Sequence, residues 1–168
     1  LKDEVALSKE KMKKIDIKAI TKSVVDDFNN IYEAKRGIQI ILKDSNTEEK
    51  HFINGIENRI EQIIANLLDN SISFSDNNKK ILVELSKDED KKIILKVIDE
   101  GKGFKETSTK KIFDRFYSNR PDNFGEHSGL GLNIVKNLVD LHGATIYASN
   151  NIIKKGANVE IVFPKVQS

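Results

Sequence analysis

Three amide side chains lie at helical spacing in the segment Glu61–Ser75, EQIIANLLDNSISFS. Gln62, Asn66 and Asn70 follow one another at intervals of four residues, so they form one row along a helix face. Asparagine is a mediocre residue for a helix interior, because its side chain competes for nearby backbone groups. Two interpretations of this segment stay open: the amides are merely solvated or bonded to local backbone, or their oxygens face a cleft and hold Mg²⁺ and phosphate.

Two glycine-containing segments offer the other parts of a nucleotide site. Asp99–Gly103, DEGKG, follows an apolar run, which places a carboxylate at a strand end beside two glycines that let the backbone approach a flat ligand. Such an aspartate can accept a hydrogen bond from an adenine amino group, although a local turn bond is the simpler explanation of this motif alone. Ser128–Leu132, SGLGL, leads into a helix whose N–H groups and dipole would bind phosphate, and alone it is weak evidence.

Between these two motifs lies Thr107–His127, a stretch with little regular pattern. It is long enough to be a functional lid rather than a plain connection. Its aromatic residues are Phe113, Phe116, Tyr117 and Phe124. A run of cations in a loop is usually solvated, so Arg115, placed between two of these aromatic residues, is the one cation that we single out.

The apolar periodicity predicts the elements that position these residues. Helices are expected at Asp16–Ala34, with Ile20, Val24, Phe28 and Ile31 on one face and a stop at Gly37, at Glu61–Ser75, and at Gly129–Leu141. Strands are expected at Ile38–Leu42, Lys80–Ser86, Lys92–Asp99, Ala144–Ser149 and Ala157–Phe163, with a turn at Asn54–Gly55. This order predicts an α/β two-layer sandwich, in which three helices lie on one face of a mixed, mostly antiparallel sheet.

Composition bounds the class of protein. The chain has 168 residues, 38% of them hydrophobic and 32% charged, which fits one soluble domain with a full core. A net charge of +2 is too small to indicate a nucleic-acid partner, and the absence of cysteine excludes disulfides and thiolate metal sites. The chain begins at Leu1 without methionine, so we expect a fragment: residues 1–14 as a linker or the end of an upstream dimerisation helix, and residues 15–168 as one catalytic domain.

The order of four motifs resembles the catalytic, ATP-binding domain of sensor histidine kinases. The larger superfamily also holds type II topoisomerases, mismatch-repair ATPases and a heat-shock chaperone. The matching segments are the N box Asn66–Asn70, the G1 box Asp99–Gly103, the F box Phe113–Tyr117 and the G2 box Gly129–Leu132. The resemblance covers about residues 16–164. It implies the Bergerat (GHKL) fold with a lid at about residues 104–128, ATP and Mg²⁺ as ligands, and a cytoplasmic location in a membrane sensor kinase.

The same resemblance implies roles for single residues. Asn66 would coordinate Mg²⁺, Asn70 would contact metal or phosphate, and Asp99 would read adenine. Arg115 would act with Asn66 in catalysis, by neutralising charge on the transferring γ-phosphoryl group. The other nucleotide-binding residues implied are Ser73, Phe74, Gly101, Gly103, Phe104, Tyr117, His127, Ser128, Gly129, Leu130, Gly131 and Leu132.

Three positions depart from the family pattern. Many members carry lysine where this chain has Ser73, tyrosine where it has Phe74, and glycine where it has His127. Hydrolytic members place a glutamate one helical turn before the metal-binding asparagine, where this chain has Gln62. An amide cannot accept a proton, so transfer to a protein is favoured over hydrolysis, unless Glu61 or Glu57 serves as the base. An ATPase module and a catalytically inert nucleotide-binding interaction module therefore remain as alternatives.

A histidine kinase also needs an acceptor histidine, and the chain has only His51, His127 and His142. None of them lies on a long helix suited to dimerisation, and His142 is expected to be a cation that favours a helix C-terminus. We therefore expect the acceptor on a separate dimerisation domain of the same kinase, with a response-regulator aspartate as the next recipient. The chain alone should bind Mg²⁺-ATP without labelling itself.

Overall fold

The computed structural model describes residues 11–45, 50–104, 112–113, 130–151, 153 and 155–166. Its helices are α2 (Ile17–Arg36), α3 (Glu57–Ser73) and α5 (Leu130–Leu141). Its strands are β1 (Lys13–Asp16), β2 (Gln39–Asp44), β3 (Phe52–Gly55), β4 (Lys80–Lys87), β5 (Ile93–Ile98), β6 (Thr145–Asn150) and β7 (Ala157–Phe163). No helix in these described ranges is long and apolar enough to cross a membrane.

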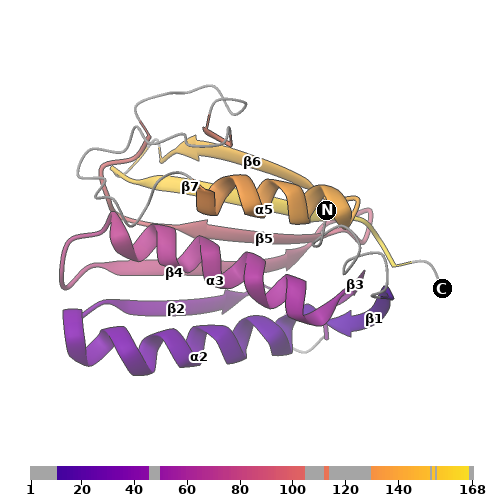
Figure 1. Cartoon of the computed structure of the whole chain (residues 1–168), viewed down its shortest axis with the longest axis horizontal. Helices are drawn as coiled ribbons and strands as arrows, with labels where there is room; N and C mark the ends of the chain where they lie inside the picture. The colour runs from indigo at the N-terminus through magenta and orange to yellow at the C-terminus, as the bar shows by residue number, and fades with distance from the viewer. Residues whose placement is uncertain are drawn as a thin grey trace.

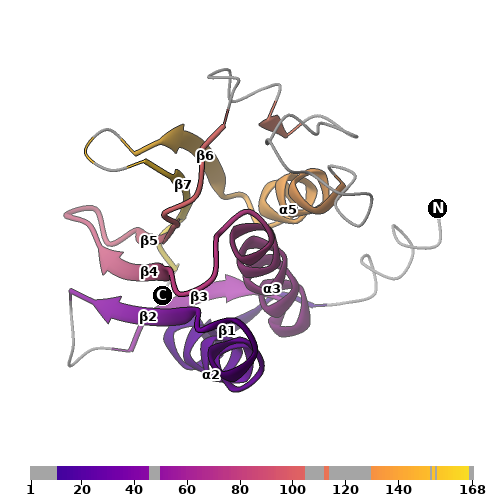
Figure 2. The same ribbon diagram turned by 90° about the vertical axis from the view of Figure 1, so that its left-hand side faces the viewer.

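The main sheet has five strands in the order β2-β4-β5-β7-β6. β2 and β4 are parallel, and every other neighbouring pair is antiparallel. The helices α2, α3 and α5 form one layer on a single face of this sheet, as Figures 1 and 2 show from two directions. The predicted α/β two-layer sandwich, with a mixed and mostly antiparallel sheet, is confirmed.

Helix α3 occupies the middle of the helix layer, with α2 on one side and α5 on the other (Figure 2). Its apolar stripe faces the sheet, and the predicted members are all buried: Ile60, Ile63, Ile64, Leu67, Leu68 and Ile72. Burying each such side chain contributes about 2 kcal/mol relative to exposure. This stripe fixes the rotation of α3, so the row that contains Asn66 and Asn70 must lie at its edge.

The opposite face of the sheet is polar at its centre. Lys43 of β2 lies beside Glu84 of β4, Glu84 beside Lys96 of β5, and Lys96 beside Glu160 of β7. The last pair is an ion pair, with Lys96 Nζ 3.5 Å from Glu160 Oε1. Opposite charges on neighbouring strands stabilise a solvated sheet face modestly, which accounts for helices on one side only.

A small second sheet was not expected from the sequence. β1 pairs antiparallel with β3, with Lys13 opposite Gly55 and Asp16 opposite Phe52. The predicted turn at Asn54–Gly55 is therefore wrong, because both residues belong to β3. Asp16 ends β1 and also caps α2, since its carboxylate accepts a hydrogen bond from the Lys18 N–H at 3.1 Å. Such pairing between two four-residue strands leaves no local pattern to detect.

Helix bounds and one buried position also differ from expectation. α3 begins at Glu57, one turn before Glu61, and α2 continues to Arg36 before the predicted stop at Gly37, which has a left-handed φ of 66°. Ile31 was expected on the inner face of α2 but is 55% exposed. Tyr32, four residues after Phe28, takes the inward place and stacks on its ring at 6.0 Å between centroids.

Candidate nucleotide-binding site

The half of α3 that carries Asn66 and Asn70 lies beside the start of α5. α3 and α5 pack against each other and run in opposite directions, because His142 at the end of α5 contacts Ile56 at the start of α3. The beginning of α5 therefore lies next to the C-terminal half of α3, which carries Asn66 and Asn70 (Figure 1). The segment that carries the predicted metal ligands therefore lies next to the helix N-terminus that would bind phosphate.

The amide side chains of Asn66 and Asn70 are half-buried. Asn66 and Asn70 are partly exposed one helical turn apart. The Ser73 hydroxyl donates to the Asn70 carbonyl at 2.9 Å, a local hydrogen bond at the C-terminus of α3. Among the described residues, no group of three or more histidine, cysteine or acidic side chains is placed to hold a metal ion. A metal held here would rest on amide oxygens and a ligand's phosphates, a donor set that suits Mg²⁺.

Asp99 is buried, and its carboxylate is held by one backbone N–H of the following loop and one of β7. Its Oδ1 accepts hydrogen bonds from the Gly101 N–H at 2.9 Å and the Ala157 N–H at 3.0 Å. Only 2% of the residue is exposed. The local turn bond left open by the sequence is therefore present, and a second bond from β7 accompanies it. These two bonds fix the orientation of the carboxylate.

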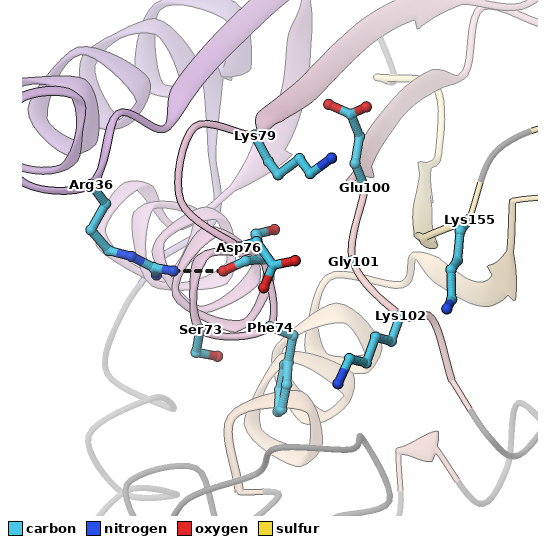
Figure 3. A pocket seen from close by; sticks show the side chains of 10 residues that line it. Arg36, Ser73, Phe74, Asp76, Lys79, Glu100, Gly101, Lys102 and Lys155 are labelled. Carbon is cyan, nitrogen blue, oxygen red and sulfur yellow. Dashed lines mark hydrogen bonds between the residues drawn. The ribbon is translucent and has the colours of Figure 1, made fainter.

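Gly101 packs directly against the turn that follows α3. A Cβ atom added there would lie 2.5 Å from the Phe74 carbonyl oxygen and 3.1 Å from Asp99 Oδ1, so a side chain cannot fit. A cavity of about 710 Å³ opens beside this contact, and Ser73, Phe74 and Gly101 are among the residues that line it (Figure 3). Three residues predicted to bind nucleotide thus share one cavity.

Phe104 and Gly103 connect the loop that follows β5 and contains Gly101, called the Gly101 loop below, to the far edge of the sheet. Phe104 is 5% exposed and packs in the hydrophobic core. Its N–H donates to Asn150 Oδ1 at 2.6 Å, and Asn150 Nδ2 donates to its carbonyl at 2.9 Å. Gly103 adopts a positive φ of 80° just before it. The chain is therefore anchored where the predicted lid begins.

The structure describes only some of the remaining predicted residues. Leu132 is buried and Gly131 is exposed in α5, and Leu130 is its first residue. The remaining predictions, for Arg115, Tyr117, His127, Ser128 and Gly129 and for most of the lid, lie outside the described residues.

Two histidines are described, and both are buried. His51 Nε2 lies 2.9 Å from Asp44 Oδ1, and Lys18 Nζ lies 2.8 Å from the other oxygen of that carboxylate. His142 Nδ1 donates to the Leu138 carbonyl at 2.8 Å, while its Nε2 accepts from the Ile56 N–H at 3.1 Å. Accepting at Nε2 requires a neutral ring, so the expected cation at the end of α5 is wrong.

The His142 ring should make folding stability sensitive to acid. Burial lowers the pKa of His142 below its ordinary value of 6.5, against a smaller opposing effect of the Leu138 hydrogen bond. The unfolded chain then binds a proton at a higher pH than the folded chain, so the free energy of unfolding should fall as the pH drops below 6.5. Urea unfolding at pH 7.5 and at pH 5.5 would measure this fall in the free energy of unfolding. The fall between the two pH values should be smaller in His142→Ala than in the wild type.

The same variant should be less stable even at neutral pH. It leaves the buried Ile56 N–H without its acceptor, which costs about 2 kcal/mol. If the free energy of unfolding depends on pH equally in the wild type and in the variant, the His142 ring is not the source of the acid sensitivity.

Three contacts of the site had no signal in the sequence. They are the Ala157 N–H on Asp99, the Asn150 side chain on Phe104, and Arg36, which lines the cavity from the end of α2. Each joins residues from separate elements, 58 and 46 positions apart in the first two cases. Only a prediction of how the strands pair and how α2 packs against α3 would have found them.

The fold is the α/β sandwich found in the catalytic domains of histidine kinases. The solved catalytic domain of histidine kinase ThkA has the same fold, with a TM-score of 0.78 at 23% identity, over 92% of this chain and 95% of that one. A mycobacterial sensor histidine kinase, MprB, aligns with a TM-score of 0.76 at 22% identity, over 91% of this chain and 97% of that one.

Sequence comparison gives the family. Residues 55–167 match the family described as histidine kinase-, DNA gyrase B-, and HSP90-like ATPases, and the chain belongs to it. The sensor protein ChvG of Agrobacterium fabrum is 34% identical over 148 residues, which is 84% of this chain and 25% of that protein. ChvG of Rhizobium meliloti is 32% identical over 159 residues, 91% of this chain and 27% of that protein. The chain thus spans about a quarter of the length of these relatives.

Proposed function

We propose that this chain is the catalytic, ATP-binding part of a protein histidine kinase. It binds Mg²⁺-ATP and hands the γ-phosphoryl group to a histidine on a separate dimerisation domain, which passes it to an aspartate of a response regulator. The observation that carries this proposal is the convergence at one site of a buried carboxylate, a glycine loop without room for a side chain, and an amide row beside a helix N-terminus.

The adenine end of the site is assigned to the Gly101 loop. Asp99 accepts a hydrogen bond from the adenine amino group, and Phe74 and Gly101 bound the space that receives the ring. Two backbone N–H groups orient the Asp99 carboxylate, which reduces the cost of ordering that side chain when adenine binds. This arrangement favours a base with a donor at that position over one with an acceptor.

The phosphate end is assigned to α3 and α5. Asn66 and Asn70 hold Mg²⁺, and the start of α5 faces the phosphates with its N–H groups. When bound, the metal neutralises charge on the phosphate oxygens. Arg115, Tyr117, His127, Ser128 and Gly129 complete this end on the strength of the sequence motifs.

Transfer to a protein fits the site better than hydrolysis does. Gln62 stands one turn before Asn66 within the same helix, and its Oε1 accepts a hydrogen bond from Arg59 Nη1 at 3.3 Å. Glu57 and Glu61 are exposed. Gln62 cannot deprotonate water, so the row lacks the general base of a hydrolase.

The proposed partners follow from the relatives. ThkA has been solved in complex with the response regulator protein TrrA, and that structure aligns with this chain with a TM-score of 0.76. The relatives ChvG are named sensor proteins. We place this chain on the cytoplasmic side of such a sensor, next to its dimerisation domain.

The proposal predicts transfer only in the presence of an acceptor. The chain, incubated with Mg²⁺ and γ-labelled ATP, should leave itself unlabelled and should label a supplied dimerisation domain on its histidine. An acceptor domain whose histidine is replaced by alanine is the control. Steady phosphate release without any acceptor would instead identify an ATPase, and labelling of the chain itself would contradict the missing acceptor.

A further inference from the structure

Arg36, the last residue of α2, reaches across to the end of α3. Its Nη1 donates to the Ile72 carbonyl at 2.7 Å and its Nη2 to the Ser75 carbonyl at 2.6 Å. Its Nε donates to Asn77 Oδ1 at 2.7 Å. Figure 3 shows this side chain extending from α2 toward the turn that follows α3. One guanidinium thus binds three acceptors that lie 36 to 41 residues away in the sequence.

These bonds supply what α3 lacks at its own C-terminus. The last carbonyls of a helix have no partner within the helix, and a cation near them is favourable. α3 has no basic residue in its last turn. Arg36 therefore caps α3 from a neighbouring helix, with charge-assisted bonds that are stronger than neutral ones. The backbone adds a fourth link, because the Asn78 N–H donates to the Arg36 carbonyl at 2.9 Å.

The capped turn is the one that the Gly101 loop touches. The two carbonyls held by Arg36 lie on either side of Ser73 and Phe74. The Phe74 carbonyl is the atom closest to the position that a Gly101 side chain would occupy, at 2.5 Å. Gly101 in turn donates to Asp99. A shift of the turn would therefore move the loop and the carboxylate that receives adenine.

We infer that Arg36 is a positioning residue for the adenine end of the nucleotide site. It acts through the Ile72 and Ser75 carbonyls. The inference rests on the proposed function, since it concerns the same site. The planar fork that holds two carbonyls cannot be reproduced by the single ammonium of lysine.

The test separates the adenine end from the phosphate end. Dissociation constants of ADP and of inorganic tripolyphosphate, both with Mg²⁺, are measured for the wild type and for Arg36→Met at a temperature where both are folded. The variant should bind ADP roughly tenfold more weakly, as expected when a charged hydrogen-bond donor is lost, and should bind tripolyphosphate as the wild type does. Lys35→Met, which removes the neighbouring exposed cation, should change neither constant.

Two further variants keep the inference testable if Arg36→Met folds poorly. Arg36→Lys retains the charge and should restore ADP affinity only in part. Asn77→Ala removes the partner of Nε alone and should leave ADP affinity within about twofold of wild type. If the Arg36 variants lose thermal stability but bind ADP normally when folded, Arg36 is structural only and the inference is overturned. If the wild type binds tripolyphosphate but not ADP, the adenine assignment falls, and the proposed function with it.

Discussion

Replacing Asp99 by asparagine should weaken ATP binding by about a hundredfold. In the variant, Oδ1 keeps its bonds from the Gly101 and Ala157 N–H groups, because these two donors need an acceptor. The new amide NH₂ group then occupies the place of the second carboxylate oxygen. It would face the adenine amino group, and two donors would meet without an acceptor between them. Calorimetric titration of the folded variant with Mg²⁺-ATP would measure the loss.

The base preference should change in the same experiment. Inosine triphosphate carries a carbonyl oxygen where ATP carries the amino group, so the asparagine NH₂ can donate to it. We expect the ratio of ATP affinity to inosine triphosphate affinity to fall by at least tenfold. Asp76→Asn is the matched control, because Asp76 is exposed and lines the cavity beside Gly101. An unchanged ratio in the Asp99 variant would show that this carboxylate does not read the base.

Replacing Asn66 by alanine should abolish the dependence of ATP binding on Mg²⁺. The substitution removes one amide oxygen from the half-buried row on α3 and leaves the apolar stripe intact. ATP affinity in the presence of Mg²⁺ should fall by about ten- to a hundredfold, while affinity measured with a chelator should stay near the wild-type value.

A helix-matched control accompanies this variant. Asn58→Ala removes an exposed amide from the first turn of the same helix and should leave both affinities unchanged. If the Asn66 variant still responds to Mg²⁺ as the wild type does, the metal is held by other residues. The phosphoryl-transfer rate to a supplied acceptor domain should fall together with the metal response.

The sequence predicted what depends on local periodicity. The buried stripe of α3 is continuous from Ile60 to Ile72, so its spacing alone determined which side of the helix faces the sheet. That orientation places the amide row at the edge of the stripe. In the strands β4 and β5, buried and more exposed residues alternate, and this pattern predicted both strands close to their observed bounds.

Contacts between distant segments were beyond such reasoning. The small sheet depends on β1 meeting β3, and neither strand has more than four residues. His142 reads as a helix-terminal cation until the Ile56 N–H is found 3.1 Å from its ring. Arg36 likewise looks like an ordinary basic residue in the last turn of α2, and only the packing of α2 against α3 shows which carbonyls it holds.

A crystal structure of the chain with Mg²⁺ and a non-hydrolysable ATP analogue would test the nucleotide site most directly. The metal should lie about 2.1 Å from Asn66 Oδ1, the distance typical of Mg²⁺–oxygen coordination. The adenine amino group should lie about 3 Å from the Asp99 carboxylate. Adenine bound away from the Gly101 loop, or a metal held without Asn66, would contradict the account.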